Sequence, residues 1–320
     1  MTISNTTTYS FQIANIYASV IITIAAVGLI ANTLIIYIFI SDKYFRKITY
    51  NLMLICAISD AVSNISGLIS NGMLLGISMN QSYTMGTVCK ISGIIINISY
   101  GVSIFNLCLI SIDRYFVIVR PLNNFYRTNK KKIVIISEIF IWLLSGSIAI
   151  PDTVYLQSQD ENEYTSMCDY PNMTVSVGVY LVSFSVFYYI LPSMAIIIIY
   201  WRIILFQQNY IRPGQQLQQM QHATSNKYKL VKSLISISSF YVSATFPFFL
   251  VLFVCGVTRT PMLQIQRSNP GLFTVCMLSL TTANNITVLS PFLYLKFDGN
   301  IRKRFHEILK NLHGTNKRGS

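Results

Sequence analysis

The residues of this chain that could do chemistry are few, and most of them are acids inside apolar sequence. Asp113 and Arg114 are adjacent and are followed by Tyr115, so a charge pair lies at the end of a long apolar stretch. Asp60 is an isolated carboxylate within another such stretch. Because ionisable groups in apolar segments are costly, each one needs a reason, which is either a structural role or a function. Asp113 and Arg114 suit a charge pair, and Asp60 suits either the binding of a cation or a proton or a structural role in which neighbouring Asn and Ser residues satisfy it.

The elements that carry these residues are predicted to be membrane-spanning helices. Hydrophobic residues make up 52% of the 320 residues and charged residues 11%, which a soluble domain could not sustain. The apolar stretches cover the whole helical circumference, so helices are expected and barrel strands are not. Cys89 and Arg114 are twenty-five residues apart, or about 37 Å of helix, which is slightly more than a hydrocarbon core.

The predicted fold is an all-α membrane protein, a bundle of seven transmembrane helices with a short amphipathic helix at the C-terminal end. We expect an extracellular N-terminus over residues 1–15, the helical domain over 16–295 and a cytoplasmic tail over 296–320. The predicted spans are 16–40, 50–75, 87–119, 133–151, 175–206, 230–257 and 272–295.

The distribution of basic residues predicts the orientation. Of the 24 Lys and Arg residues, 21 fall in the first, third and fifth connections and the tail, and only Lys90, Arg259 and Arg267 fall on the other side. Loops rich in Lys and Arg stay in the cytoplasm. The N-terminus is therefore predicted outside and the C-terminus inside. The net charge of +13 is explained by this topology, and no nucleic-acid partner is expected.

Three glycosylation sequons agree with that orientation, because Asn5, Asn80 and Asn172 all fall in segments predicted outside. Cys89 and Cys168 are the two of six cysteines in aqueous outer segments, and they predict a disulfide in an oxidising compartment. The outer segment 152–172 has five acids and no Lys or Arg, so an acidic cap that attracts cations is expected. Residues 300–312 read as an amphipathic helix on the inner leaflet.

Glu138 is a further acid in an apolar stretch, one turn before Trp142. Both are expected on an inward face. No function follows for Glu138 from the sequence.

Motifs in every span together make the chain resemble the rhodopsin-like, class A G-protein-coupled receptors over nearly its whole length. They are Gly28 and Asn32; Asp60; Cys89 with Asp113-Arg114-Tyr115; Pro121-Leu122; Trp142; Pro192 and Tyr200; Phe246-Pro247; and Ser290-Pro291-Phe292-Leu293-Tyr294. Each motif alone is weak, whereas their order and spacing are specific.

The resemblance implies a receptor mechanism. An extracellular agonist would swing the inner half of the sixth helix outward and open a cavity for a heterotrimeric G protein. The residues implied in coupling and activation are Asp113, Arg114, Tyr115, Leu122, Tyr200, Pro247, Pro291 and Tyr294. Arg114 would be held by Asp113 at rest and would reach Tyr200 in the active state.

Three departures from the family pattern affect these expectations. Lys227 stands where many relatives have an acid that restrains Arg114, which predicts a basal activity that Lys227→Glu should lower. Thr245 replaces the usual Trp before Pro247, so coupling to the sixth helix is altered. Ser290 replaces Asn or Asp, which weakens the sodium site expected at a polar core of Asn32, Asp60, Ser99, Ser103 and Ser290; this sodium ion is the sole cofactor considered.

The ligand must enter the bundle or rest on the loops. Ile96 lies where amine receptors carry an Asp, and Asn284 lies where a light receptor needs a Lys for its Schiff base, so both ligand classes are disfavoured. The predicted pocket residues are uncharged and mostly aromatic: Asn97, Tyr100, Phe184, Tyr188, Thr245, Phe248, Phe249 and Asn284. They equally suit mutual packing. With the acidic cap they suit a short peptide with a basic residue, which we prefer, or a neutral small molecule.

Other classes of protein fit less well. A transporter or channel would show repeated halves, broken helices or several buried charges. An enzyme is not predicted, because the three histidines lie on the cytoplasmic side and neither a metal-ligand cluster nor a nucleophile with its base is present. No catalytic residue and no metal site are therefore assigned. A non-signalling decoy of the receptor fold at the plasma membrane stays open.

Overall fold

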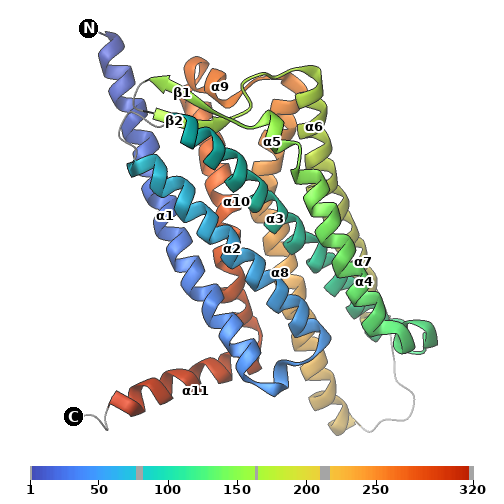
Figure 1. Ribbon diagram of the computed structural model, residues 1–320. Coiled ribbons are helices and arrows are strands. Elements are labelled where there is room, and N and C mark those ends of the chain that lie inside the picture. Colours follow the sequence, from blue (N-terminus) through green and yellow to red (C-terminus); the bar gives the residue numbers. More distant parts are fainter. Residues whose placement is uncertain (1, 77–81, 163–164, 210–216, 317–320) are drawn as a thin grey trace.

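The computed structural model describes residues 2–76, 82–162, 165–209 and 217–316, and long helices run side by side between its two ends (Figure 1). The helices are α1 Thr2–Ser41, α2 Ile48–Gly76, α3 Ser82–Ile118, α4 Asn124–Ala149, α5 Asp152–Tyr155, α6 Val175–Ser185, α7 Leu191–Asn209, α8 Leu217–Thr258, α9 Met262–Ser268, α10 Pro270–Phe297 and α11 Gly299–Asn316. A 3₁₀ turn, η1, covers Lys43–Phe45, a π-helical turn, η2, covers Val186–Ile190, and two strands, β1 and β2, cover Gln157–Asn162 and Thr165–Asp169.

The predicted seven-helix bundle is confirmed. In the described part of the chain six helical segments are long and apolar enough to cross a membrane, and α10 supplies the seventh when its halves, 270–283 and 287–297, are taken as one span bent by 50°. The fifth span is continuous through α6, η2 and α7. Its π turn ends just before Pro192, whose missing N–H removes an α-helical hydrogen bond and allows the turn to widen.

Side-chain caps explain where several helices begin. Asn123 accepts the N–H of Tyr126 at the start of α4, and Asn269 accepts the N–H of Leu272 at the start of α10. Such caps satisfy the amide groups that the first helical turn leaves unpaired. Both helices therefore start at a residue that the sequence itself specifies.

Apolar side chains divide between the core of the bundle and its outside. Ile35, Leu52, Ile110 and Ile203 are buried between helices, whereas Ile30 on α1 is 72% exposed. A soluble protein would not leave such large apolar side chains in water over whole helix faces. The outward apolar faces match a lipid environment, and the chain is a multi-pass membrane protein.

Helices α6 and α8 touch backbone to backbone through two glycines. A Cβ atom on Gly178 would lie 2.6 Å from the carbonyl oxygen of Gly256, and one on Gly256 would lie 2.9 Å from that of Gly178. Real Cβ contacts are longer, so only glycine permits this approach. The contact fixes the outer part of α8, and Pro247 interrupts the same helix further inward.

The end that carries β1 and β2, called the outer end, is closed by a short hairpin (Figure 1). The strands pair antiparallel, with Ser158 opposite Cys168. A disulfide joins Cys168 to Cys89 on α3, with the Cα atoms 5.6 Å apart. The predicted disulfide is therefore confirmed, and it fixes the hairpin to the third span.

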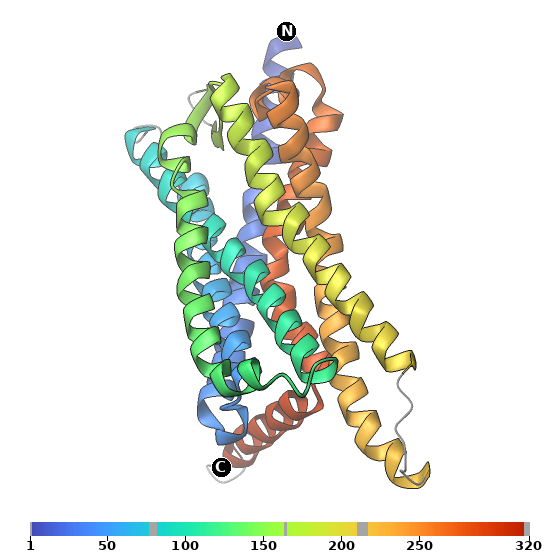
Figure 2. The ribbon, with the colours of Figure 1, turned by 90° about the vertical axis from the view of Figure 1, so that its right-hand side faces the viewer.

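At the opposite, inner end, α11 turns away from the bundle (Figure 1). Asp298 directs this turn, because its carboxylate accepts the N–H groups of Asn300 and Ile301 at 2.8 and 3.3 Å and the hydroxyl of Tyr50 at 2.9 Å. Figure 2 shows α8 extending past the other spanning helices at this end.

Candidate functional site

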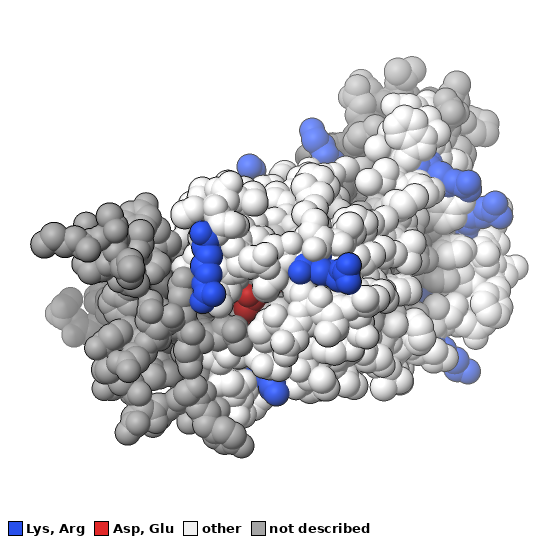
Figure 3. Space-filling model, turned by 90° about the horizontal axis from the view of Figure 1, so that it is seen from above, with Lys and Arg blue, Asp and Glu red and all other residues white. Residues whose placement is uncertain are grey.

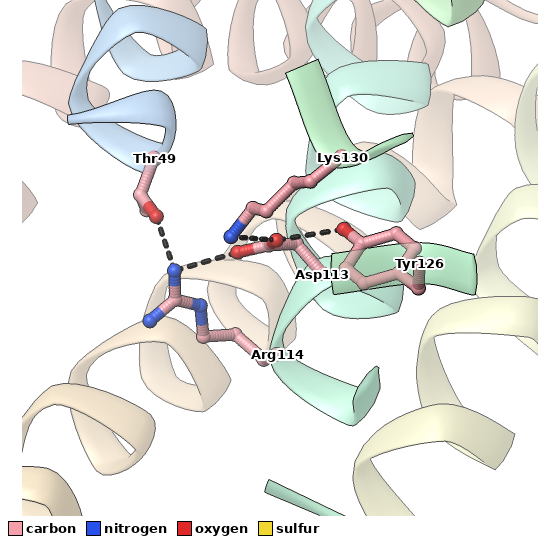
Figure 4. A network of polar contacts seen from close by, with 5 residues as sticks. All are labelled: Thr49, Asp113, Arg114, Tyr126 and Lys130. Carbon is pink, nitrogen blue, oxygen red and sulfur yellow. Dashed lines mark hydrogen bonds and ion pairs between the residues drawn. The ribbon is translucent and has the colours of Figure 1, made fainter. Parts of the chain in front are cut away.

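The predicted charge pair lies at the inner end of α3, and further side chains contact both of its members (Figure 4). Asp113 is buried, and its carboxylate contacts the Arg114 guanidinium at 2.6 Å and the Lys130 ammonium at 2.5 Å. The Tyr126 hydroxyl donates to the same carboxylate at 2.7 Å. Two cations and one neutral donor thus share one acid. A charge that is paired in this way can be buried without the full cost of desolvation.

Arg114 also bonds outside this cluster, because its guanidinium donates to the hydroxyl of Thr49 at the start of α2 (Figure 4). Tyr200 of α7, its predicted partner in the active state, is buried. The Tyr200 hydroxyl makes no hydrogen bond of standard geometry within the described part of the chain. The arrangement ties α2, α3 and α4 together through Arg114 and Asp113 and leaves α7 out.

The other residues implied in activation are spread over several elements. Tyr115 is partly buried, Leu122 is 87% exposed, and Tyr294 is buried at the end of α10. Pro247 and Pro291 lie within α8 and α10.

The predicted polar core is buried between α1, α2, α3 and α10. The Ser103 hydroxyl donates to the Asp60 carboxylate at 2.9 Å, and Ser290 is a second hydrogen-bonding neighbour of that carboxylate. Ser99 instead pairs with Ser59, whose backbone carbonyl it contacts at 2.7 Å. The structure therefore brings Asp60, Ser103 and Ser290 together and directs Ser99 elsewhere.

Asn32 of α1 belongs to the same polar region. Its amide donates to the carbonyl oxygens of Gly28 and Thr287, at 3.0 and 2.9 Å, so it joins α1 to α10. The amide oxygen of Asn32 has no hydrogen-bond partner within the described residues.

Most of the predicted pocket residues form one aromatic cluster between α3, the fifth span and α8. The Tyr100 ring lies 5.1 Å from that of Phe249 and 6.1 Å from that of Tyr188, and Phe184 lies 4.6 Å from Tyr188. Phe248 packs on Phe249 at 5.0 Å. These rings pack against one another, as aromatic side chains in protein cores do. Among the described residues, the buried Tyr100 hydroxyl has no hydrogen bond of standard geometry.

The two unusual residues of α8 lie against this cluster. Thr245 and Tyr241 are hydrogen-bonding neighbours of Tyr100, and the Tyr241 ring is 5.5 Å from the Tyr100 ring. Thr245 donates to the carbonyl of Tyr241 within its own helix, at 2.9 Å. Contact between α3 and α8 is thus made by tyrosine rings, with a threonine where the family pattern has Trp.

The prediction of an acidic cap at the outer end is wrong for two of its five acids, because Asp152 and Asp169 are buried. Asp152 accepts hydrogen bonds from Asn97 at 2.5 Å and from the hydroxyls of Tyr170 and Tyr180 at 2.9 Å each. Asn97, a predicted pocket residue, is therefore committed to this network. Seen from above, the described surface shows one small acidic patch (Figure 3).

Asp169 is the second buried acid of this segment. Its carboxylate accepts the N–H groups of Tyr170 at 2.8 Å and Leu263 at 3.0 Å, which joins β2 to α9. Burial raises the pKa of Asp169, and the N–H donors oppose that rise. The outer loops are therefore held to each other and to α3 by buried acids and the disulfide.

Some predicted residues fall outside what the structure describes. Asn80 lies outside the described residues, and the side chains of Asn5, Lys227 and Asn284 do too. Asn172 is exposed between β2 and α6. Within the described part, no group of three or more His, Cys, Asp or Glu residues is placed to hold a metal ion.

Sequence reasoning missed several residues of the inner cluster. Lys130, Tyr126 and Thr49 all contact Asp113 or Arg114, yet no motif singled them out. In the sequence, Lys130 cannot be distinguished from the other lysines of the inner connections, which are explained by membrane orientation alone. The expectation that Trp142 faces inward is wrong, because Trp142 is 45% exposed.

The comparison with family models decides the class of protein. Residues 31–294 match the model for the 7 transmembrane receptor (rhodopsin family), which is well over half of the chain. The chain belongs to the rhodopsin family of seven-transmembrane receptors. The predicted resemblance is thereby confirmed, and membership of a receptor family agrees with the prediction that the chain is not an enzyme.

Curated members of this rhodopsin family are similar to the chain at low identity. Neuropeptide FF receptor 2 of Mus musculus is 23% identical over 312 residues, which cover 92% of this chain and 73% of that receptor. Tachykinin-like peptides receptor 86C of Drosophila melanogaster is 22% identical, with 88% and 56% covered. Opsin Rh1 of Calliphora vicina is 31% identical over 60% of this chain and 51% of the opsin.

Proposed function

We propose that this rhodopsin-family receptor lies in the plasma membrane, with its N-terminus outside, and activates a heterotrimeric G protein when an extracellular ligand binds. The outer end would receive the ligand, and the inner end, with Arg114 and Leu122, would receive the G protein. The predominance of basic residues in the predicted inner loops supports the orientation.

The observation that carries the proposal is the difference between the present partners of Arg114 and Tyr200, its expected partner in the active state. In this structure its guanidinium is bonded to Asp113 and Thr49. The buried Tyr200 hydroxyl on α7 lies beside Ser111 and Ser238 but makes no hydrogen bond of standard geometry among described residues. A poorly satisfied buried hydroxyl costs free energy, and a guanidinium can satisfy it. The cost of moving Arg114 toward Tyr200 would therefore be partly compensated, and the move would break the hydrogen bond by which Arg114 joins α3 to Thr49 of α2.

For the ligand we propose a short peptide. The two peptide receptors above match about nine-tenths of the chain, and their names refer to neuropeptide FF and to tachykinin-like peptides. A peptide would contact the outer loops and reach toward the aromatic cluster. The hydroxyl of Tyr100 has Thr245 and Tyr241 as hydrogen-bonding neighbours but makes no hydrogen bond of standard geometry among the described residues, so a ligand could bond it. A neutral small molecule is the alternative that the same apolar cluster supports.

A sodium ion is compatible with the polar core. Asp60 offers a buried carboxylate, and the hydroxyl oxygens of Ser103 and Ser290 lie beside it. Oxygen ligands of this kind suit a hard cation. We propose these three residues, and not Ser99, as the ligands if sodium binds.

The test is nucleotide exchange on purified G proteins by the chain in lipid nanodiscs, with neuropeptide FF and tachykinin-like peptides as probes. A peptide-dependent increase that is lost in Arg114→Ala and retained in Arg120→Ala would support the proposal, because Arg120 is an exposed arginine in the same region. A response that survives in Arg114→Ala would contradict the role of Arg114. Peptide binding without any exchange would indicate a decoy receptor.

A further inference from the structure

Glu138 of α4 and Asn106 of α3 form a buried polar site that the signalling mechanism does not use. Asn106 is fully buried, and the two carboxyl oxygens of Glu138 are also shielded from solvent. Asn106 is the hydrogen-bonding neighbour of the Glu138 carboxyl. Both residues lie within membrane-spanning segments. An acid and an amide therefore meet inside the apolar part of the bundle.

All four polar side-chain atoms of this pair lack a hydrogen bond of standard geometry within the described residues. They are the amide nitrogen and oxygen of Asn106 and both carboxyl oxygens of Glu138. No ion pair of Glu138 occurs there either. The Cys56 thiol of α2 interacts electrostatically with Glu138 and supplies no positive charge.

The protonation state of Glu138 decides whether these atoms can be satisfied. An ionised carboxylate only accepts hydrogen bonds, so it could pair with the Asn106 nitrogen but would repel the Asn106 oxygen. A neutral carboxylic acid has one donor and one acceptor, which match the acceptor and donor of a primary amide. One bound proton thus allows two hydrogen bonds and leaves no buried charge.

We propose that Glu138 and Asn106 form an intramembrane proton-binding site, in which the neutral acid and the amide are joined by two hydrogen bonds. The ligand of this site is a proton. The pair fastens α3 to α4 without any charge, so these two helices stay together while other helices move.

The first test is infrared spectroscopy of the purified chain in lipid nanodiscs. The carbonyl band of a protonated carboxylic acid should be present in the wild type and lost in Glu138→Gln. It should shift to higher frequency in Asn106→Leu, which removes the hydrogen bond to the carbonyl. Asp60→Asn serves as the control, because Asp60 is another buried acid whose band must be told apart.

The second test uses unfolding half-lives at elevated temperature. Glu138→Gln keeps a donor and an acceptor, so its half-life should stay within about twofold of the wild type. Asn106→Leu leaves Glu138 unpaired and should shorten the half-life by about tenfold or more. Neither measurement requires G-protein coupling.

Two results would overturn the proposal. An infrared spectrum of Glu138→Gln that matches the wild type in the acid carbonyl region would show that Glu138 is ionised. A half-life or acid band that depends on sodium, and loses that dependence in Glu138→Gln, would show a metal cation in place of the proton. Replacing sodium by choline in the buffer makes this comparison.

Discussion

Asp113 illustrates how one residue can hold several helices in one state. Its carboxylate has Arg114, Lys130 and Tyr126 as partners, so three side chains compete for one acid. When Arg114 leaves, Lys130 and Tyr126 stay bound and the buried charge remains paired. Because an unpaired buried charge is strongly destabilising, a second cation lowers the cost of releasing Arg114.

Lys130→Gln tests this role of the second cation. With Lys130 gone, Arg114 is the sole cation on Asp113 and is held more tightly, so ligand-free nucleotide exchange should fall by about fivefold, equivalent to about 1 kcal/mol. The measurement is basal exchange on purified G proteins in nanodiscs. Lys131→Gln is the matched control, since Lys131 is exposed. An increase in basal exchange would mean that Lys130 restrains the resting state instead.

At the scale of elements, the bundle depends on how closely particular helices approach. The glycine contact between α6 and α8 brings two backbones together at Gly178 and Gly256, where no side chain fits. Buried acids also hold elements together at the outer end, by hydrogen bonds. Asp152 joins α3, α5 and α6, and Asp169 joins β2 to α9. With these outer contacts fixed, we expect movement to be confined to the inner half.

Gly178→Ala should disrupt this approach. The added methyl group would meet the carbonyl oxygen of Gly256, so the helices must separate, and we expect a loss of about 1–3 kcal/mol of stability. Thermal unfolding in detergent measures it. Gly146→Ala on α4 is the control, because a Cβ atom added there would meet nothing within 4 Å, and helix propensity predicts a gain of about 1 kcal/mol. Equal effects of the two substitutions would contradict the contact.

The helices could be predicted because their sequence signal is local, and the disulfide could be predicted because few cysteines were candidates for it. Long apolar runs require helices in lipid, and Cys89 and Cys168 had few competitors. The partners of Asp152 could not be predicted in this way. Acidic loop residues usually face water, and only the packing of Tyr170 and Tyr180 around Asp152 shows that this one does not. Lys130 was missed for the same reason, since its pairing depends on the position of α4 against α3.

At the scale of the whole molecule, two ends of different chemistry are separated by an apolar belt. Ile136 and Leu143 on α4 and Trp201 on α7 are all more than 60% exposed, as expected for lipid-facing positions. The hairpin lies at one end of the bundle and α11 at the other (Figure 1). The disulfide is at the hairpin end, and the ion cluster is at the inner end of α3. Such polarity suits a protein that carries information across a membrane.

Asn172 provides a test of the orientation. It is exposed at the outer end, within Asn-Met-Thr, so a receptor with this end outside should carry a glycan there. Treatment with a glycosidase should increase the gel mobility of the chain from eukaryotic cells, and Asn172→Gln should remove part or all of that shift. Asn64→Gln is the control, because Asn64 is also in a sequon and is buried. An unchanged shift in Asn172→Gln would argue against a glycan at this site.

Because α8 is long, a small change of its bend at Pro247 would produce a large displacement of its inner tip. The helix begins at Leu217, thirty residues before the proline, so its inner arm is about 45 Å long. With the outer part fixed at Gly256, a change of about 10° in the bend at Pro247 would carry the far tip through about 8 Å. The helix is thus a mechanical amplifier, and a spectroscopic label near its inner tip would give the largest signal for the smallest rearrangement at the ligand end.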